Sequence, residues 1–98
     1  MSVKPSLALS QNREMIRRIV LRYRSSNPRI FGSVLHGTDT EVSNLDLLID
    51  PLPGATLFDL GAIQIELEES LGVAVDVLTP EDLPPKFREQ VLDTAVPV

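Results

Sequence analysis

Two short apolar segments, residues 45–49 and 73–78, most constrain what this chain can form. Each has the composition and length of a buried strand. Between them the pattern predicts one helix that begins after Thr56 and ends at Gly72. The side chains expected on its buried face are Leu57, Leu60, Ile63, Leu67 and Leu71. Because strands that alternate with helices form layered sheets, we predict an α/β domain with a small sheet flanked by helices.

Further elements are predicted on either side of this unit. A helix is expected over 11–24, with Ser10 as its N-cap, because apolar side chains recur there on one arc of a helical wheel. A short strand is expected at 29–31. A last helix is expected at 85–94, because a proline suits its first position, and an edge extension of the sheet should follow at 96–98.

The composition excludes several classes of protein. No cysteine is present, which excludes disulfides, thiolate metal sites and a cysteine nucleophile. The length suffices for one modest core, so a single domain over 1–98 is expected. The apolar runs are short and no signal peptide is recognised, so we expect a cytoplasmic protein without a membrane contact. Aromatic residues make up 4% of the chain, which leaves few side chains to stack on bases, so no direct nucleic-acid partner is expected.

The net charge of −5 hides an uneven distribution along the chain. Residues 1–30 carry seven basic side chains and one acidic side chain, whereas residues 31–98 carry two basic and thirteen acidic side chains. The arginines of the first helix form either an ordinary solvated face or a contact surface for an anionic partner. The helix after Thr56 has a second apolar stripe that a partner protein could cover, formed by Phe58, Ala62 and Ile65.

Polar residues follow the short strand expected at 29–31 and interrupt the apolar pattern of the strand expected at 45–49. Gly32 and Ser33 start a turn that could be one turn of helix, whose backbone N–H groups favour phosphate, although such a pair is more often only a turn. Asn44 and Asp46 lie two residues apart, on one face of a strand whose other side chains are apolar. Oxygen atoms at that spacing can converge on Mg²⁺, but the same pattern describes the solvent face of an amphipathic strand.

A carboxylate also interrupts the last apolar segment. Asp76 lies within residues 73–78, where a charge is costly unless it is paired, hydrogen-bonded or bound to a metal. If this strand neighbours the strand at 45–49, Asp76 can supply a third oxygen ligand. Otherwise Asp76 is an acid on an edge strand that faces water.

In combination these features are more specific than any one of them. The order Gly32-Ser33, ten intervening residues, Asn44-Leu45-Asp46, a helix and then Asp76 resembles the DNA polymerase β-like nucleotidyltransferase superfamily. The pattern of that superfamily is Gly-Ser, a spacer and Asp-x-Asp. The flanking sequence is similar to the minimal nucleotidyltransferases, or MNT proteins, in residues 31–34, 43–60 and 75–80. The resemblance covers nearly all residues from 30 onward.

The resemblance implies a mixed sheet flanked by helices and a site for a nucleotide with its metal. Ser33, with Gly32, would contact the triphosphate of ATP or of another nucleoside triphosphate. Asp46 would be a metal ligand, and Asp76 would be the third carboxylate, which helps to activate the acceptor. The implied cofactor is Mg²⁺, held by Asn44, Asp46 and Asp76, and the implied reaction is transfer of a nucleoside monophosphate to a hydroxyl group.

Two positions depart from the pattern of the family. Asn44 stands where the family has its first aspartate, and an amide oxygen lacks the charge that offsets dehydration of Mg²⁺. This exchange weakens the case for catalysis but not the case for nucleotide binding. Asp39 and Glu41 are near in sequence and could compensate. His36 stands where many relatives have arginine, and it is either a phosphate contact or an exposed loop histidine.

MNT proteins are typically encoded beside a HEPN-family protein that resembles an RNase toxin, with the MNT protein as its antitoxin. The resemblance therefore implies an enzyme that transfers AMP from ATP and Mg²⁺ to a tyrosine hydroxyl of a HEPN-family RNase toxin. The alternative is a catalytically impaired domain that neutralises its HEPN partner by binding alone. Transfer to a small molecule such as an aminoglycoside is disfavoured, because those enzymes need a further domain to build the acceptor pocket.

Overall fold

One four-stranded sheet organises the structure, a computed structural model that describes residues 3–98. The strand order is β3-β2-β1-β4, with bounds Ser25–Phe31 for β1, Leu45–Pro51 for β2, Val75–Leu78 for β3 and Val96–Pro97 for β4. Strand β1 is antiparallel to both β2 and β4, whereas β2 and β3 are parallel. The expected mixed sheet and its edge extension are confirmed. Strand β3 starts two residues later than expected because its first residue pairs with the first residue of β2.

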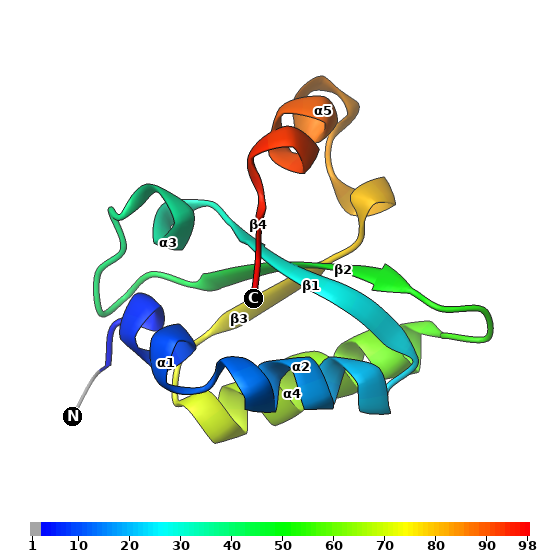
Figure 1. The fold of residues 1–98 in the computed structure, drawn as a ribbon, viewed down its shortest axis with the longest axis horizontal. Coiled ribbons are helices and arrows are strands. Elements are labelled where there is room, and N and C mark those ends of the chain that lie inside the picture. The colour runs from blue at the N-terminus through cyan, green and yellow to red at the C-terminus, as the bar shows by residue number, and fades with distance from the viewer. Residues whose placement is uncertain (1–2) are drawn as a thin grey trace.

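Helices cover the two faces of this sheet unequally (Figure 1). On one face lie α1 (Pro5–Gln11), α2 (Arg13–Arg22) and α4 (Leu57–Leu71), and on the other lie α3 (Ser33–His36), the 3-10 turn η1 (Pro80–Asp82) and α5 (Pro85–Thr94). The core lies between the sheet and the first group, where the fully buried side chains include Ile16, Val20, Leu45, Leu47, Ile49, Ile63 and Leu67. No helix within residues 3–98 is both long enough and apolar enough to cross a membrane.

Helix α4 has the boundaries that its sequence predicts. The backbone N–H of Thr56 donates to Asp59 at 2.8 Å in a capping box, and Gly72 ends the helix with a φ of 70°. The expectation that Leu57 belongs to the buried face is wrong, because the first turn of α4 precedes the buried turns and leaves this side chain 84% exposed. In the second apolar stripe, Phe58 and Ile65 are exposed, as a surface open to a partner requires.

The single helix expected over 11–24 is wrong, because two helices meet at Asn12. The backbone of Asn12, with φ −138° and ψ 26°, leaves the helical region. Its side-chain Nδ2 donates to the carbonyl oxygen of Ala8 at 2.9 Å, which stabilises the break. Ser10 therefore lies inside α1 and caps no helix, whereas Pro5 takes the first position of α1.

Strand β1 begins at Ser25, earlier than the expected start at Arg29. Helix α2 ends sooner than expected, and Arg24 and Asn27 adopt positive φ values of 56° and 51°. These two residues turn the chain into the strand and bend it there. As a result, the residue pairing between β1 and β2 is irregular over the first half of β1 and regular from Arg29 onward.

Candidate functional site

The parallel pairing of β2 and β3 brings two predicted site residues together. Asp46 is the second residue of β2, Asp76 is the second residue of β3, and the two are paired in register. Phe31, the last residue of β1, pairs with Asp46 from the other side. Because Leu45 and Leu47 are buried in the core, Asp46 points to the opposite face of the sheet, the face that carries α3.

Gly32 allows the backbone to pass directly over the Asp46 carboxylate. Its φ is 74° and its ψ is −149°, a combination that L-residues with side chains rarely adopt. A Cβ atom at this position would overlap Oδ2 of Asp46. The helical turn expected after Gly32 is confirmed as α3, in which Ser33 is the first residue and half-buried, and His36 is the last residue and exposed.

Asn44 lies just before β2, and its side chain reaches the third strand. Nδ2 of Asn44 donates a hydrogen bond to Oδ2 of Asp76 at 2.9 Å. Both side chains are exposed, whereas Asp46 is half-buried. Asp76 is thus at once a neighbour of the second strand and an acid on the edge of the sheet. The three predicted oxygen ligands, Asn44, Asp46 and Asp76, lie together.

The carboxylates of Asp46 and Asp76 lie near each other, and no basic side chain within residues 3–98 forms an ion pair with either. The ion pairs found among residues 3–98 all lie elsewhere. Burial, the charge of Asp76 and a hydrogen bond with Asp76 raise the pKa of Asp46 to about 6. A hard cation between the two carboxylates would remove this repulsion, so the donor set fits a metal such as Mg²⁺.

The nearby acids Asp39 and Glu41 do not replace the missing first aspartate. The carboxylate of Asp39 accepts the backbone N–H of Ser6 at 2.9 Å in the first turn of α1, and this bond holds the pKa of Asp39 below its usual value. Glu41 is exposed in a turn. In the part of the chain that the structure describes, no three His, Cys, Asp or Glu side chains gather as a metal site. The third polar side chain beside Asp46 and Asp76 is therefore that of Asn44, whose amide nitrogen faces Asp76.

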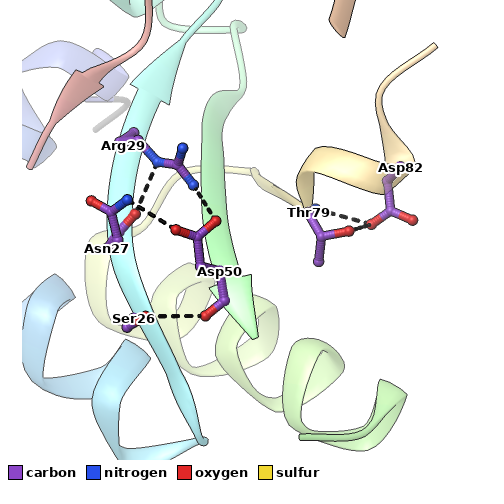
Figure 2. Close-up of polar contacts among 6 residues, drawn as sticks. All are labelled: Ser26, Asn27, Arg29, Asp50, Thr79 and Asp82. Carbon is purple, nitrogen blue, oxygen red and sulfur yellow. Dashed lines mark hydrogen bonds and ion pairs between the residues drawn. The ribbon is translucent and has the colours of Figure 1, made fainter. Parts of the chain in front are cut away.

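A second polar cluster lies at the other end of β2 (Figure 2). Asp50 accepts hydrogen bonds from Arg29 at 2.6 Å and from the side chain of Asn27 at 2.9 Å. Nε of Arg29 also donates to the carbonyl oxygen of Asn27 at 3.1 Å. Sequence reasoning missed this cluster, although the even spacing of Asp46 and Asp50 already places both on one face of the strand.

The turn after β3 matches its sequence signature. Both the backbone N–H and the hydroxyl of Thr79 donate to Asp82 at 3.0 Å, and these two bonds cap the turn (Figure 2). Arg88 of α5 donates to the carbonyl oxygens of Pro80, Glu81 and Leu83 and so holds α5 against this turn.

Comparisons with known proteins agree with this geometry. A family model described as a nucleotidyltransferase domain matches residues 13–98. A candidate protein adenylyltransferase of Methanocaldococcus jannaschii is 38% identical over 80 residues, which are 82% of this chain and 86% of that protein. The solved structure of a candidate minimal nucleotidyltransferase is 39% identical with a TM-score of 0.84, and the match covers 95% of each chain.

A more distant solved structure, a toxin-antitoxin with AMP-PNP, has a TM-score of 0.73 at 17% identity. The match covers 88% of this chain and 71% of that one, and at such identity the likeness concerns the fold. The family match, the relative and the first solved structure together extend over most of the chain and include the paired strands of the site. The chain belongs to the nucleotidyltransferase domain family, as a protein of the minimal nucleotidyltransferase type.

Proposed function

We propose that this chain is an antitoxin that transfers AMP from ATP to a tyrosine hydroxyl of a HEPN-family RNase toxin. The observation that carries the proposal is the pairing of Asp46 with Asp76 beneath the backbone of Gly32. Membership of the nucleotidyltransferase family supports the reaction class. The protein adenylyltransferase relative supports a protein acceptor, and the toxin-antitoxin structure with AMP-PNP supports a toxin partner and a nucleotide. The HEPN identity of the toxin rests on the MNT resemblance.

Each candidate residue has a role in this proposal. Gly32 and Ser33 hold the phosphates of ATP or of another nucleoside triphosphate, and His36, at the end of the same helical turn, adds a phosphate contact. Asp46, Asp76 and the amide oxygen of Asn44 would hold Mg²⁺. Bound there, Mg²⁺ would neutralise phosphate charge and stabilise the departing pyrophosphate.

The chemical step uses the difference in exposure between the two carboxylates. Asp76 is exposed at the sheet edge and can meet an incoming protein side chain, whereas Asp46 is half-buried under α3. Asp76 takes the proton of the tyrosine hydroxyl while the tyrosine oxygen forms a bond to the α-phosphorus of ATP. The bond from that phosphorus to the bridging oxygen breaks, and pyrophosphate leaves with the bonding electrons.

Asn44 favours a second function, which is neutralisation of the HEPN partner by binding alone. Its amide nitrogen donates to Oδ2 of Asp76 at 2.9 Å, a hydrogen bond that an aspartate at this position could not donate. With Asn44 in place of an aspartate, the site has two carboxylates where the family pattern has three. A site with less negative charge offsets less of the cost of Mg²⁺ dehydration.

An assay with labelled ATP separates the two functions. The chain is incubated with α-labelled ATP, Mg²⁺ and the HEPN-family protein encoded beside it, and the Asn44→Asp variant is assayed in parallel. Label on a tyrosine of the partner from the unaltered chain supports transfer. If only the Asn44→Asp variant labels the partner, while the variant and the unaltered chain both suppress the RNase, transfer by this chain is excluded. That result supports neutralisation by binding without transfer. Asn44→Asp combined with Asp46→Asn is the matched control and should give no label.

A further inference from the structure

The helix layer behind the sheet has two surfaces of opposite charge. The basic α2 surface consists of Arg13, Arg17, Arg18 and Leu21, all exposed. The acidic α4 surface consists of Phe58, Ile65, Glu66 and Glu69. Glu14 is the single acid of α2, and α4 has no basic residue. The α2 side therefore combines exposed Leu21 with a net positive charge, and the α4 side combines exposed Phe58 and Ile65 with negative charge.

These two surfaces lie next to each other. Nη1 of Arg22 on α2 contacts Oε1 of Glu66 on α4 at 2.5 Å, and both helices cover the same face of the sheet (Figure 1). A groove of about 540 Å³ lies on α4 beside the end of α2, lined by Tyr23, Ala62, Ile65, Glu66, Glu69 and Ser70. Its lining is apolar at Ile65 and acidic at the two glutamates, a combination that fits an apolar side chain flanked by arginines.

We propose that the helix layer forms a twofold contact with a second copy of this chain. In this dimer, the basic α2 surface of one copy faces the acidic α4 surface of the other copy, and the symmetry repeats the contact. Leu21 lies one helical turn after Arg17 and Arg18, so these side chains are neighbours on the exposed side of α2, and Leu21 suits the groove beside Ile65. Because both surfaces lie on one layer, a single twofold axis that runs parallel to that layer, between the two copies, can satisfy both contacts.

The exposure of the apolar side chains supports an interface at this layer. Leu21 is 61% exposed, Phe58 is 89% exposed and Ile65 is 60% exposed. Large apolar side chains gathered on one side of a small protein are typical of a binding surface. A second copy is the occupant we infer, because this chain itself presents the basic, partly apolar helix that the acidic groove requires.

The proposed dimer leaves the nucleotide site open. Asp46 points to the face of the sheet that carries α3, whereas α2 and α4 cover the other face. Nucleotide and acceptor can therefore approach Asp46 and Asp76 in either copy. The inference does not rest on nucleotide transfer, so loss of one claim leaves the other intact.

Sedimentation equilibrium of the full chain tests the dimer. At micromolar to submillimolar concentration and low salt, we expect twice the chain mass of 10.8 kDa. Added salt should promote dissociation, because exposed ionic contacts are screened. Arg18→Glu and Glu69→Arg should each raise the Kd roughly tenfold, because the symmetry doubles the effect of each reversal. The two reversals combined should restore the Kd of the unaltered chain, and Glu89→Arg on α5 is the charge-matched control that should change nothing.

Three results would overturn the proposal. The first is a monomer over the whole concentration range, with circular dichroism that shows a folded chain. The second is a dimer whose Kd does not respond to the single reversals or is not restored by the double reversal. The third is a monomer whose binding to the HEPN-family protein is lost in Glu69→Arg, which would assign the acidic α4 surface to that partner instead.

Discussion

Two carboxylates on the same face of β2 have opposite surroundings. Asp50 is neutralised by Arg29 at 2.6 Å and accepts a second hydrogen bond from Asn27 at 2.9 Å (Figure 2). Asp46, four residues earlier, faces the carboxylate of Asp76, and its pKa is raised to about 6. The charge of Asp50 therefore joins β1 to β2, whereas the charge at Asp46 remains available to a cation that arrives with a ligand.

An apolar side chain, Leu48, lies between Asp46 and Asp50 on this face of β2. Leu48 points to the same side as Asp46 and Asp50 but is fully buried, because the η1 turn covers this part of β2. The two charged clusters are thus divided by an apolar contact. A substitution at one end should therefore act on that end alone, which makes the comparison open to experiment.

The largest effect on stability is expected at Gly32, where the backbone meets Asp46. Gly32→Ala should lower the free energy of unfolding by about 3 kcal/mol, because its φ of 74° and ψ of −149° disfavour a side chain and its Cβ would overlap the Asp46 carboxylate. Gly37→Ala is the matched control, since Gly37 also has a positive φ, 71°, but has open space where the Cβ would lie.

Urea unfolding of the two variants checks this prediction. Gly37→Ala should cost only about 1 kcal/mol, from backbone strain alone. Equal losses in the two variants would mean that the close approach to Asp46 is unimportant. If Asp46→Ala is combined with Gly32→Ala, the combined loss should be smaller than the sum of the single losses, because the overlap is gone.

A smaller effect is expected at the paired end of β2. Asp50→Asn should lower the free energy of unfolding by about 1.5 kcal/mol, because it removes the ionic partner of Arg29, whose side chain is only 13% exposed. Glu66→Gln is the matched control, because its partner Arg22 is 59% exposed, and it should cost about 0.5 kcal/mol or less. Thermal or urea unfolding measures both, and a larger loss in Glu66→Gln would contradict this interpretation of Asp50.

The smallest effect is the pH dependence that Asp46 contributes. Its pKa is raised from 3.8 to about 6 on folding. The unfolded chain thus loses this proton at lower pH, so the contribution of Asp46 to stability is full below about pH 4 and is lost as the pH rises through about 6. Because Asp46 is partly exposed, the expected loss is about 1 kcal/mol.

Unfolding of the unaltered chain and of Asp46→Asn, in buffer with a chelator, should reveal this contribution. The unaltered chain should lose stability relative to Asp46→Asn between about pH 4 and about pH 7. Parallel pH profiles for the two proteins would show that burial and the charge of Asp76 do not raise the pKa of Asp46 on folding.

Local patterns predicted the elements that carry the site. The alternation around Asp46 indicated a strand with one polar face, and the Thr56 capping box and Gly72 indicated the bounds of α4. The contact between Asn44 and Asp76 spans 32 residues and depends on which strands become neighbours, which no local pattern specifies. From the residues alone, the approach of Asp76 to Asn44 and Asp46 therefore stayed conditional on strand pairing, and the family resemblance supplied the grouping of these candidate ligands.

Errors arose where backbone geometry overrode a side-chain pattern. Apolar residues continue through the break at Asn12, so only its backbone conformation and the bond to Ala8 reveal two helices. The pair formed by Arg29 and Asp50 joins residues 21 apart on neighbouring strands, and its existence depends on the pairing of β1 with β2. Tertiary contacts of this kind are not encoded in the periodicity of either segment.

The most direct test of the contrast between Asp46 and Asp50 is the affinity for ATP, measured by calorimetry with and without Mg²⁺. We expect the unaltered chain to bind ATP in a manner that depends on Mg²⁺, and Asp46→Asn to weaken this binding about tenfold or more. Asp50→Asn should leave the affinity within about twofold, because its charge is already used by Arg29. Equal affinities for the unaltered chain and Asp46→Asn, or a loss in Asp50→Asn as large as that in Asp46→Asn, would contradict a nucleotide and metal site at Asp46.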